Sequence, residues 1–171
     1  MRDNGMNMAT APSAISLDEY MRTDYSPDCE YVDGVVLERN VGQGKHSYTQ
    51  GKLIRKLPED RGRLVLPEQR VRVAEYRVRI PDVCVIEQLQ PVISEPPLLC
   101  IEVLSPDDRW NRVNQKVADY IAMGVPCVWI VDPYERRAWI IDQDRPPAEV
   151  SDGILRSRDF EIALSEVLPP E

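Results

Sequence analysis

Several residue types that often build functional sites are scarce in this chain of 171 residues. Its single histidine, His46, excludes a metal site made of several histidines. The four cysteines are widely spaced and form no CxxC pair, so we interpret them as core thiols of a protein in a reducing compartment. No apolar run approaches the ~20 residues that a membrane-spanning helix needs. The cysteines are Cys29, Cys84, Cys100 and Cys127.

The chain also has fewer basic residues than acidic ones, 21 Lys and Arg against 29 Asp and Glu. The net charge of −8 excludes a protein that coats nucleic acid by charge alone, because counterion release requires a basic face. The segment from Lys45 to Arg79 is the exception, with ten Lys and Arg against four Asp and Glu. Strand alternation places four arginines of this segment on polar faces, where they meet either solvent or phosphate groups. These arginines are Arg70, Arg72, Arg77 and Arg79.

The N-terminal stretch is polar where a secretory peptide needs an apolar block. We therefore expect residues 1–14 to form a flexible lead-in, without export, and we predict a cytoplasmic protein. The remaining residues, 15–171, have a length typical of one domain with a single core.

The apolar pattern predicts helices alternating with short strands. Asp33-Gly34 between β-branched runs is a strong signal for a tight hairpin turn, and Gly124 stands where a helix commonly ends. Helices are expected over 16–21, 46–57 and 112–123, a hairpin over 29–39, and strands over 63–67, 69–76, 77–87, 98–106, 125–133 and 136–142. This order indicates an α/β (α+β) fold in which a mixed central sheet is flanked by helices.

Two carboxylates occur inside apolar strand segments. Asp82 follows Pro81 within the segment 77–87, and Glu102 lies within 98–106. A buried carboxylate is unfavourable unless it meets a cation or hydrogen-bond donors, and two on neighbouring strands repel each other. A divalent ion bound through their oxygens removes both penalties, and Mg²⁺ needs only one or two protein carboxylates. Each acid alone could instead be satisfied by backbone donors or by an arginine.

Lys116 lies at the edge of the apolar stripe of the helix predicted over 112–123. Its stem can lie on the sheet while its ammonium group reaches beyond, so it could orient a water or stabilise charge on a phosphoryl oxygen. A lysine in this position is also a common surface residue.

The chain contains P-D, then E-V-L-S-P about twenty residues later, and then a helix with a lysine. This order is similar to the PD-(D/E)XK nuclease pattern. More closely, the chain resembles the Uma family of restriction-endonuclease-like proteins, in its Uma-two branch, from about residue 17 to 168. The matching residues are Glu30, Asp33, Gly34, His46, Ile80 to Val83, Ile101 to Pro106, Lys116, Tyr120, Gly124 to Pro126, Trp129, Asp132 and Pro133.

This resemblance implies a restriction-endonuclease-like fold and a phosphodiesterase site that uses Mg²⁺, with Mn²⁺ as a possible substitute. Asp82 and Glu102 are then metal ligands, with the carbonyl of Val103 as a third oxygen. The lysine of the motif is expected two positions after the acid, where Leu104 stands, so Lys116 becomes its replacement. Arg112 departs from the acidic residue that many members carry before the helix lysine.

Three further residues are weaker candidates. Gln50 lies in the helix that often contributes a Glu or Gln to such sites, and Glu30 is the other polar candidate; both could instead make structural hydrogen bonds. His46 has a pKa suited to proton transfer, but we expect it at the surface near the start of its helix.

We therefore expect a metal-dependent endonuclease acting on nucleic acid, with DNA as the favoured substrate. Two alternatives stay open: a catalytically inactive binding module with the nuclease fold, and a hydrolase of a small phosphate ester. A homodimer is plausible because the apolar segment AWII, residues 138–141, could offer a sheet edge or face. No membrane partner is expected.

Overall fold

The structure, a computed structural model, describes residues 14–40 and 42–171. Within these residues the chain forms four helices, and none of them is both long and apolar enough to cross a membrane. They are α1 (Leu17–Arg22), α2 (Gly44–Lys56), α3 (Trp110–Met123) and α4 (Leu164–Val167). The first three match the predicted helices to within two residues at each end. The predicted lead-in over 1–14 lies outside the described residues except for Ala14.

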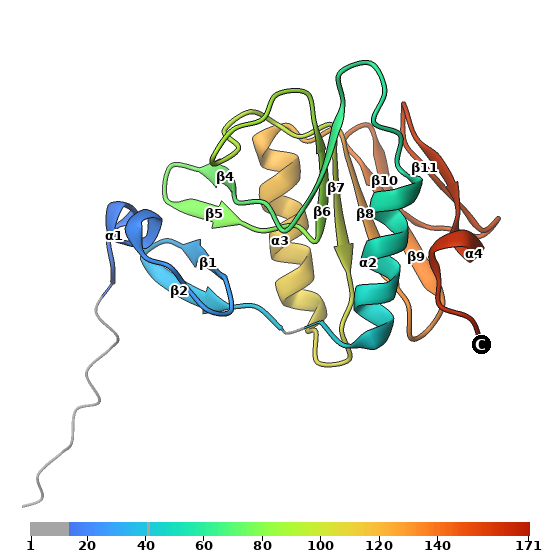
Figure 1. Cartoon of the computed structure of the whole chain (residues 1–171), viewed down its shortest axis with the longest axis horizontal. Helices are drawn as coiled ribbons and strands as arrows, with labels where there is room; N and C mark the ends of the chain where they lie inside the picture. Colours follow the sequence, from blue (N-terminus) through green and yellow to red (C-terminus); the bar gives the residue numbers. More distant parts are fainter. Residues whose placement is uncertain (1–13, 41) are drawn as a thin grey trace, which may run out of the picture.

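The described strands form three sheets (Figure 1). The largest has the order β10-β9-β8-β7-β6-β3, and within it β7 and β8 run parallel while the other neighbours are antiparallel. Its strands are β3 (Leu64–Pro67), β6 (Val83–Ile86), β7 (Leu99–Val103), β8 (Cys127–Asp132), β9 (Arg137–Asp142) and β10 (Arg145–Glu149). The predicted mixed central sheet is confirmed.

Two smaller sheets flank this central one. The first has the order β2-β1-β5-β4 and carries the predicted hairpin at one end of the molecule (Figure 1). Its strands are β1 (Cys29–Val32), β2 (Val35–Glu38), β4 (Val71–Ala74) and β5 (Arg77–Arg79). The second pairs β11 (Ile154–Arg156) with β12 (Glu161–Ala163).

Helices α2 and α3 cover opposite faces of the central sheet. In Figure 1, α3 lies to the left of strands β6 and β7, and α2 lies to the right. Along β7, Ile101 and Val103 join the apolar cluster that contains Leu53 of α2. Cys100 joins the cluster that contains Val117 of α3. By the alternation of side chains along a strand, Glu102 points to the α3 face with Cys100.

The hairpin turn follows the chemistry of its sequence. Asp33 and Gly34 have φ angles of 49° and 91°, the left-handed conformations that a two-residue turn between antiparallel strands requires. Glycine is also needed for space, since a Cβ at position 34 would lie 2.9 Å from the Cβ of Ala14. The turn brings β1 and β2 together, and β1 carries Glu30 toward the interior.

The strand predicted over 77–87 is wrong as one continuous element. It breaks into β5 and β6. Strand β5 belongs to the four-stranded sheet that contains the hairpin, the hairpin sheet, and β6 belongs to the central sheet. Pro81 lies at the break, where it lacks the amide hydrogen that a continuing ladder needs. Asp82 therefore stands at the junction of two sheets, immediately before β6.

The prediction that these arginines meet either solvent or phosphate groups is wrong for Arg79. Arg72 is exposed, but the side chain of Arg79 is 2% exposed and buried in ion pairs with Glu30 and Asp119. The reason is that β5 is an interior strand of the four-stranded sheet, between β1 and β4, so its polar face packs against other elements.

The segment AWII offers no sheet edge. Strand β9, which contains it, lies between β8 and β10, so the edge on this side belongs to β10. The sequence of β10 contains Pro146 and Pro147, and prolines oppose pairing with a further strand. A homodimer stays a prediction, without this segment as its edge contact.

Candidate active site

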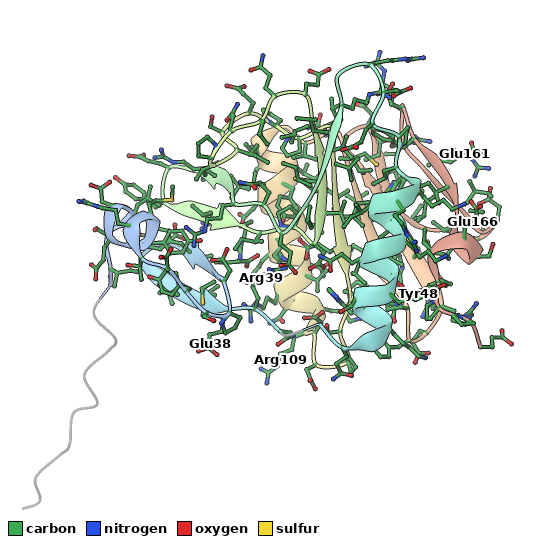
Figure 2. The ribbon with its side chains drawn as sticks, in the orientation of Figure 1. Glu38, Arg39, Tyr48, Arg109, Glu161 and Glu166 are labelled. Carbon is green, nitrogen blue, oxygen red and sulfur yellow. The ribbon has the colours of Figure 1, made fainter. Side chains whose placement is uncertain are left out.

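A small cavity opens where the end of the hairpin, the start of α2, the end of β7 and the first half of α3 meet. Its volume is about 50 Å³, room for a few water molecules, since one needs roughly 10–15 Å³ of such space. Figure 2 shows Arg39, one of the lining residues, between the hairpin and α2. The lining residues are Glu30, Arg39, Asn40, His46, Asp82, Glu102, Val103, Leu104, Ser105, Asp108, Arg112, Val113 and Lys116.

Asp82 and Glu102 face this cavity from neighbouring strands. Val83 of β6 pairs with Ile101 of β7 in the antiparallel register, and continuing that register by one residue sets Asp82 opposite Glu102. Directly opposed residues project from the same face of a sheet. Both residues are buried, with 5% and 6% of their surface exposed. The two carboxylates therefore share one small space that excludes most solvent.

Asp82 is held by three donors. Its Oδ2 accepts from the amide of Val103 at 2.7 Å, and Nε2 of His46 lies 3.4 Å from the same oxygen. Its Oδ1 accepts from the guanidinium of Arg39 at 2.9 Å. Burial works to raise the pKa of Asp82, but the hydrogen bond from His46 and the charge of Lys116 outweigh it and keep this pKa below its usual value. Asp82 is therefore an ionised carboxylate at neutral pH.

Glu102 is bound from α3. The hydroxyl of Tyr120 donates to Oε1 at 2.7 Å, and the ammonium of Lys116 pairs with Oε2. Burial raises the pKa of Glu102 to about 7, with Lys116 opposing the shift and Asp82 adding to it. A carboxylate so reluctant to ionise is stabilised by any additional cation in the cavity.

Lys116 is a buried residue, not a surface one. Its ammonium lies 3.1 Å from Oε1 of Glu30 in addition to its contact with Glu102. Burial works to lower the pKa of Lys116, but the carboxylates of Glu102 and Glu30 outweigh it and hold this pKa above its ordinary value. Lys116 therefore keeps its positive charge at the cavity wall.

Glu30 anchors this lysine from the hairpin. It is 1% exposed, and its carboxylate also accepts from Arg79 at 2.9 Å and from the amide of Ile80 at 3.1 Å. Arg79 in turn pairs with Asp119 of α3 at 2.7 Å. This chain of buried ion pairs ties the hairpin sheet to α3 and fixes the direction of Lys116.

Comparison with known proteins adds the family. The model of the Uma2 family, described as "Putative restriction endonuclease", matches residues 17–169. This chain belongs to the Uma2 family.

A crystal structure described as a putative nuclease belonging to DUF820, from Anabaena variabilis, is similar with a TM-score of 0.79 and 20% sequence identity. The match covers 90% of this chain and 97% of that one. At this identity the likeness shows the fold, and the predicted restriction-endonuclease-like fold is confirmed. A search of curated proteins finds no significant match.

The polar groups of this Uma2 chain are of the kind that suits a hard divalent ion, but protein cations already occupy them. Two carboxylates and a main-chain carbonyl beside water-sized space are the donors that Mg²⁺ prefers. Within the described part of the chain, however, no group of three or more His, Cys, Asp or Glu side chains is arranged to hold a metal. All four oxygens of Asp82 and Glu102 accept from protein donors. An ion at these two acids would therefore compete with Arg39 for Asp82 and with Lys116 for Glu102.

The site residues predicted from the sequence fall into two groups. The cavity brings together Asp82, Glu102, Val103, Lys116 and Glu30. Gln50 does not line it: its amide donates to the backbone carbonyl of Asp82 at 2.9 Å and so supports the turn before β6. The roles proposed for these residues in the Uma2 site stay predictions.

The predicted surface position of His46 is wrong. His46 is 6% exposed, and its ring points at Asp82. The first turns of α2 pack against the junction between β5 and β6, so the polar face of this helix is covered there. Among the described residues, Nδ1 of His46 is buried without a hydrogen-bond partner.

The sequence patterns did not predict the roles of two residues at this site. Arg39 lies 43 positions from Asp82 in the chain, and no local pattern indicates that pairing. Tyr120 matched the family pattern but was assigned no role; its position four residues after Lys116 on one helix face was the available signal.

Proposed function

We propose that this chain is a Mg²⁺-dependent nuclease that hydrolyses phosphodiester bonds of nucleic acid, with DNA as the main substrate. The observation that carries the proposal is the opposition of Asp82 and Glu102 across β6 and β7 in one cavity with the ammonium of Lys116. Membership of the Uma2 family supports the assignment to a nuclease.

Asp82, Glu102 and the carbonyl of Val103 are the groups that would hold Mg²⁺ or Mn²⁺. When bound, such an ion would stabilise the negative charge of a developing oxyanion and would activate a water molecule. The remaining lining residues orient these ligands. His46 and the amide of Val103 fix Asp82, and Tyr120 fixes Glu102.

Lys116 contributes a permanent positive charge. Because Glu102 and Glu30 hold the pKa of Lys116 above its ordinary value, we assign Lys116 an electrostatic role and not that of a general base. Its ammonium is aimed at the cavity and stabilises negative charge on a phosphoryl oxygen placed there. Glu30 acts through Lys116 as a positioning residue, since its carboxylate holds the ammonium from β1.

The cavity beside Asp82 and Glu102 has room for a phosphate group and not for a whole nucleotide. A volume of about 50 Å³ is far below the roughly 300 Å³ of the smallest ordinary ligand pockets. A phosphodiester group can enter, while the flanking nucleosides stay outside. Arg112 at the rim and the exposed Arg109, which Figure 2 shows at the start of α3, can meet the neighbouring phosphates.

A cleavage assay tests this proposal. Purified protein is incubated with Mg²⁺ or Mn²⁺ on supercoiled plasmid, linear duplex and single-stranded DNA. We expect metal-dependent cleavage that is lost in Asp82→Asn and Glu102→Gln and kept in Glu166→Gln, whose carboxylate pairs with Lys56 far from the cavity. Equal cleavage by all variants would show that the site is elsewhere.

One observation favours a second candidate, a non-catalytic binding module. Arg39 and Lys116 already neutralise the two acids without a metal. Titration calorimetry separates the candidates, because a non-catalytic scaffold gives no Mg²⁺ or Mn²⁺ binding that depends on Asp82 and Glu102.

A further inference from the structure

A second, larger cavity adjoins the proposed active site. Its volume is about 320 Å³, and it shares Leu104, Ser105, Asp108 and Val113 with the lining of the first. This volume reaches the lower end of the range for small organic ligands. A group bound here lies directly beside a phosphate in the catalytic cavity.

An aromatic residue forms one wall of this second cavity. Trp110, the first residue of α3, is 46% exposed, far more than a tryptophan in a core. Its ring meets that of Trp139 edge to face, with 4.8 Å between the centroids and an angle of 84°. Because Trp139 fixes the orientation of Trp110, the exposed indole surface is a preorganised platform for stacking.

Tyr134 also lines this cavity. Its hydroxyl is buried, and no other group in the described part of the chain hydrogen-bonds to it. A buried hydroxyl without a partner is unfavourable. The ammonium of Lys45 lies 5.4 Å from the centre of the Tyr134 ring.

The remaining polar groups of this cavity are acidic. Asp108, Asp132 and Glu135 line it, so it disfavours a phosphate and favours a flat group with N–H donors. Aromatic surface and carboxylate acceptors beside a phosphate site are together the chemistry of a nucleobase pocket.

We infer that this cavity, between Trp110 and Tyr134, is a nucleobase subsite that takes an unpaired base next to the cleaved phosphodiester. This inference rests on the proposed function and deepens it, because it names the form of the substrate. A base stacked inside a duplex cannot enter the cavity, so the preferred substrate is a single strand or a base that has left the helix.

Binding of a fluorescent single-stranded oligodeoxynucleotide tests the subsite. Anisotropy is measured with Ca²⁺ in place of Mg²⁺ to keep the strand intact. Loss of one base–aromatic stack predicts that Trp110→Ala weakens binding by roughly 5- to 150-fold, while Trp110→Phe retains most of the affinity. Tyr76→Ala, which removes an aromatic residue that is 54% exposed on the hairpin sheet, is the matched control and binds as the wild type does.

A set of oligonucleotides with one abasic position each provides the second arm. One position should weaken binding to the wild type as much as Trp110→Ala does, and the same abasic strand should cause no further loss in Trp110→Ala. Equal affinity of the wild type and Trp110→Ala, or additive losses at every abasic position, would overturn the subsite. Thermal denaturation followed by circular dichroism verifies that each variant is folded.

The two proposals fail in different ways. If the wild type never cleaves DNA but its binding depends on Trp110 and one base, the subsite stands and the catalytic proposal fails. If the wild type cleaves DNA and Trp110→Ala has an unchanged KM on single strands, the catalytic proposal stands and the subsite fails.

Discussion

The guanidinium of Arg39 lies 2.9 Å from Oδ1 of Asp82, the oxygen that the amide of Val103 leaves free. Arg39 is mostly buried, with 14% of its side chain exposed. It therefore occupies the place of a cation on this carboxylate, and a metal ion must compete with it.

Replacement of this arginine should separate folding from metal binding. Arg39→Met keeps much of the side-chain volume and removes the charge, so we expect the metal-free protein to lose about 3 kcal/mol of stability and to bind Mn²⁺ more tightly than the wild type. Urea denaturation and titration calorimetry measure the two effects. The control Arg63→Met removes an arginine that is similarly covered and pairs with the more exposed Asp159, and it should leave Mn²⁺ affinity unchanged. Unaltered Mn²⁺ affinity in Arg39→Met would contradict this competition.

Tyr120 should matter for Glu102 as well as for stability. Its hydroxyl donates to a charged acceptor, and removal of such a bond in Tyr120→Phe is expected to lower stability by about 2 kcal/mol and to weaken Mn²⁺ binding. Tyr20→Phe removes a buried hydroxyl that donates to the carbonyl of Cys29 at 2.6 Å in the hairpin region. That variant should lose stability without a change in Mn²⁺ affinity. A purely structural Tyr120 would give the same pattern in both variants.

Removal of the charge on Lys116 should affect catalysis more than metal binding. In Lys116→Met, loss of one preorganised cation is expected to lower kcat by about 10²–10³-fold, while Mn²⁺ still binds because Glu102 loses a competing partner. Lys56→Met, which breaks an exposed pair with Glu166, serves as the control with normal kcat. Loss of Mn²⁺ binding together with kcat would instead make Lys116 a support of the metal ligands.

The buried ion pairs of Glu30 should make the stability of the fold depend on pH. Burial works to raise the pKa of Glu30, but the charges of Lys116 and Arg79 outweigh it and lower this pKa below 4.5. A carboxylate with a lowered pKa stabilises the fold above its unfolded value, and this stabilisation is lost as the pH falls through the folded value. Glu30→Gln should therefore be less stable at pH 7 and should lose less on acidification below about pH 4.5 than the wild type. Parallel urea midpoints of the two proteins across that range would disprove the assignment.

The sequence was sufficient for features that depend on local chemistry. Asp33-Gly34 predicted the hairpin because few other residues accept the left-handed turn, and Gly124, with a φ of 107°, ended α3 as expected. The apolar runs around Glu102 and Trp129 predicted two buried strands, which became the parallel pair β7 and β8.

Features that depend on long-range packing were not predictable from the same patterns. Pro81 gave a signal for the break before Asp82, but only the two-sheet arrangement explains why the chain turns there. The burial of His46 follows from the contact of α2 with that junction, and the pairing of Arg39 with Asp82 joins segments with no shared local pattern. The two acids and Lys116 could be named from the sequence, whereas Arg39, which neutralises Asp82, could not.

The central claim is that Asp82 and Glu102 bind one divalent ion between them. The most direct measurement is an anomalous difference map from a crystal soaked in Mn²⁺. We expect a single strong peak within coordination distance of an oxygen of each carboxylate, with Arg39 moved away from Asp82. A map without a peak at this position at saturating Mn²⁺, with Arg39 still bound to Asp82, would contradict the claim.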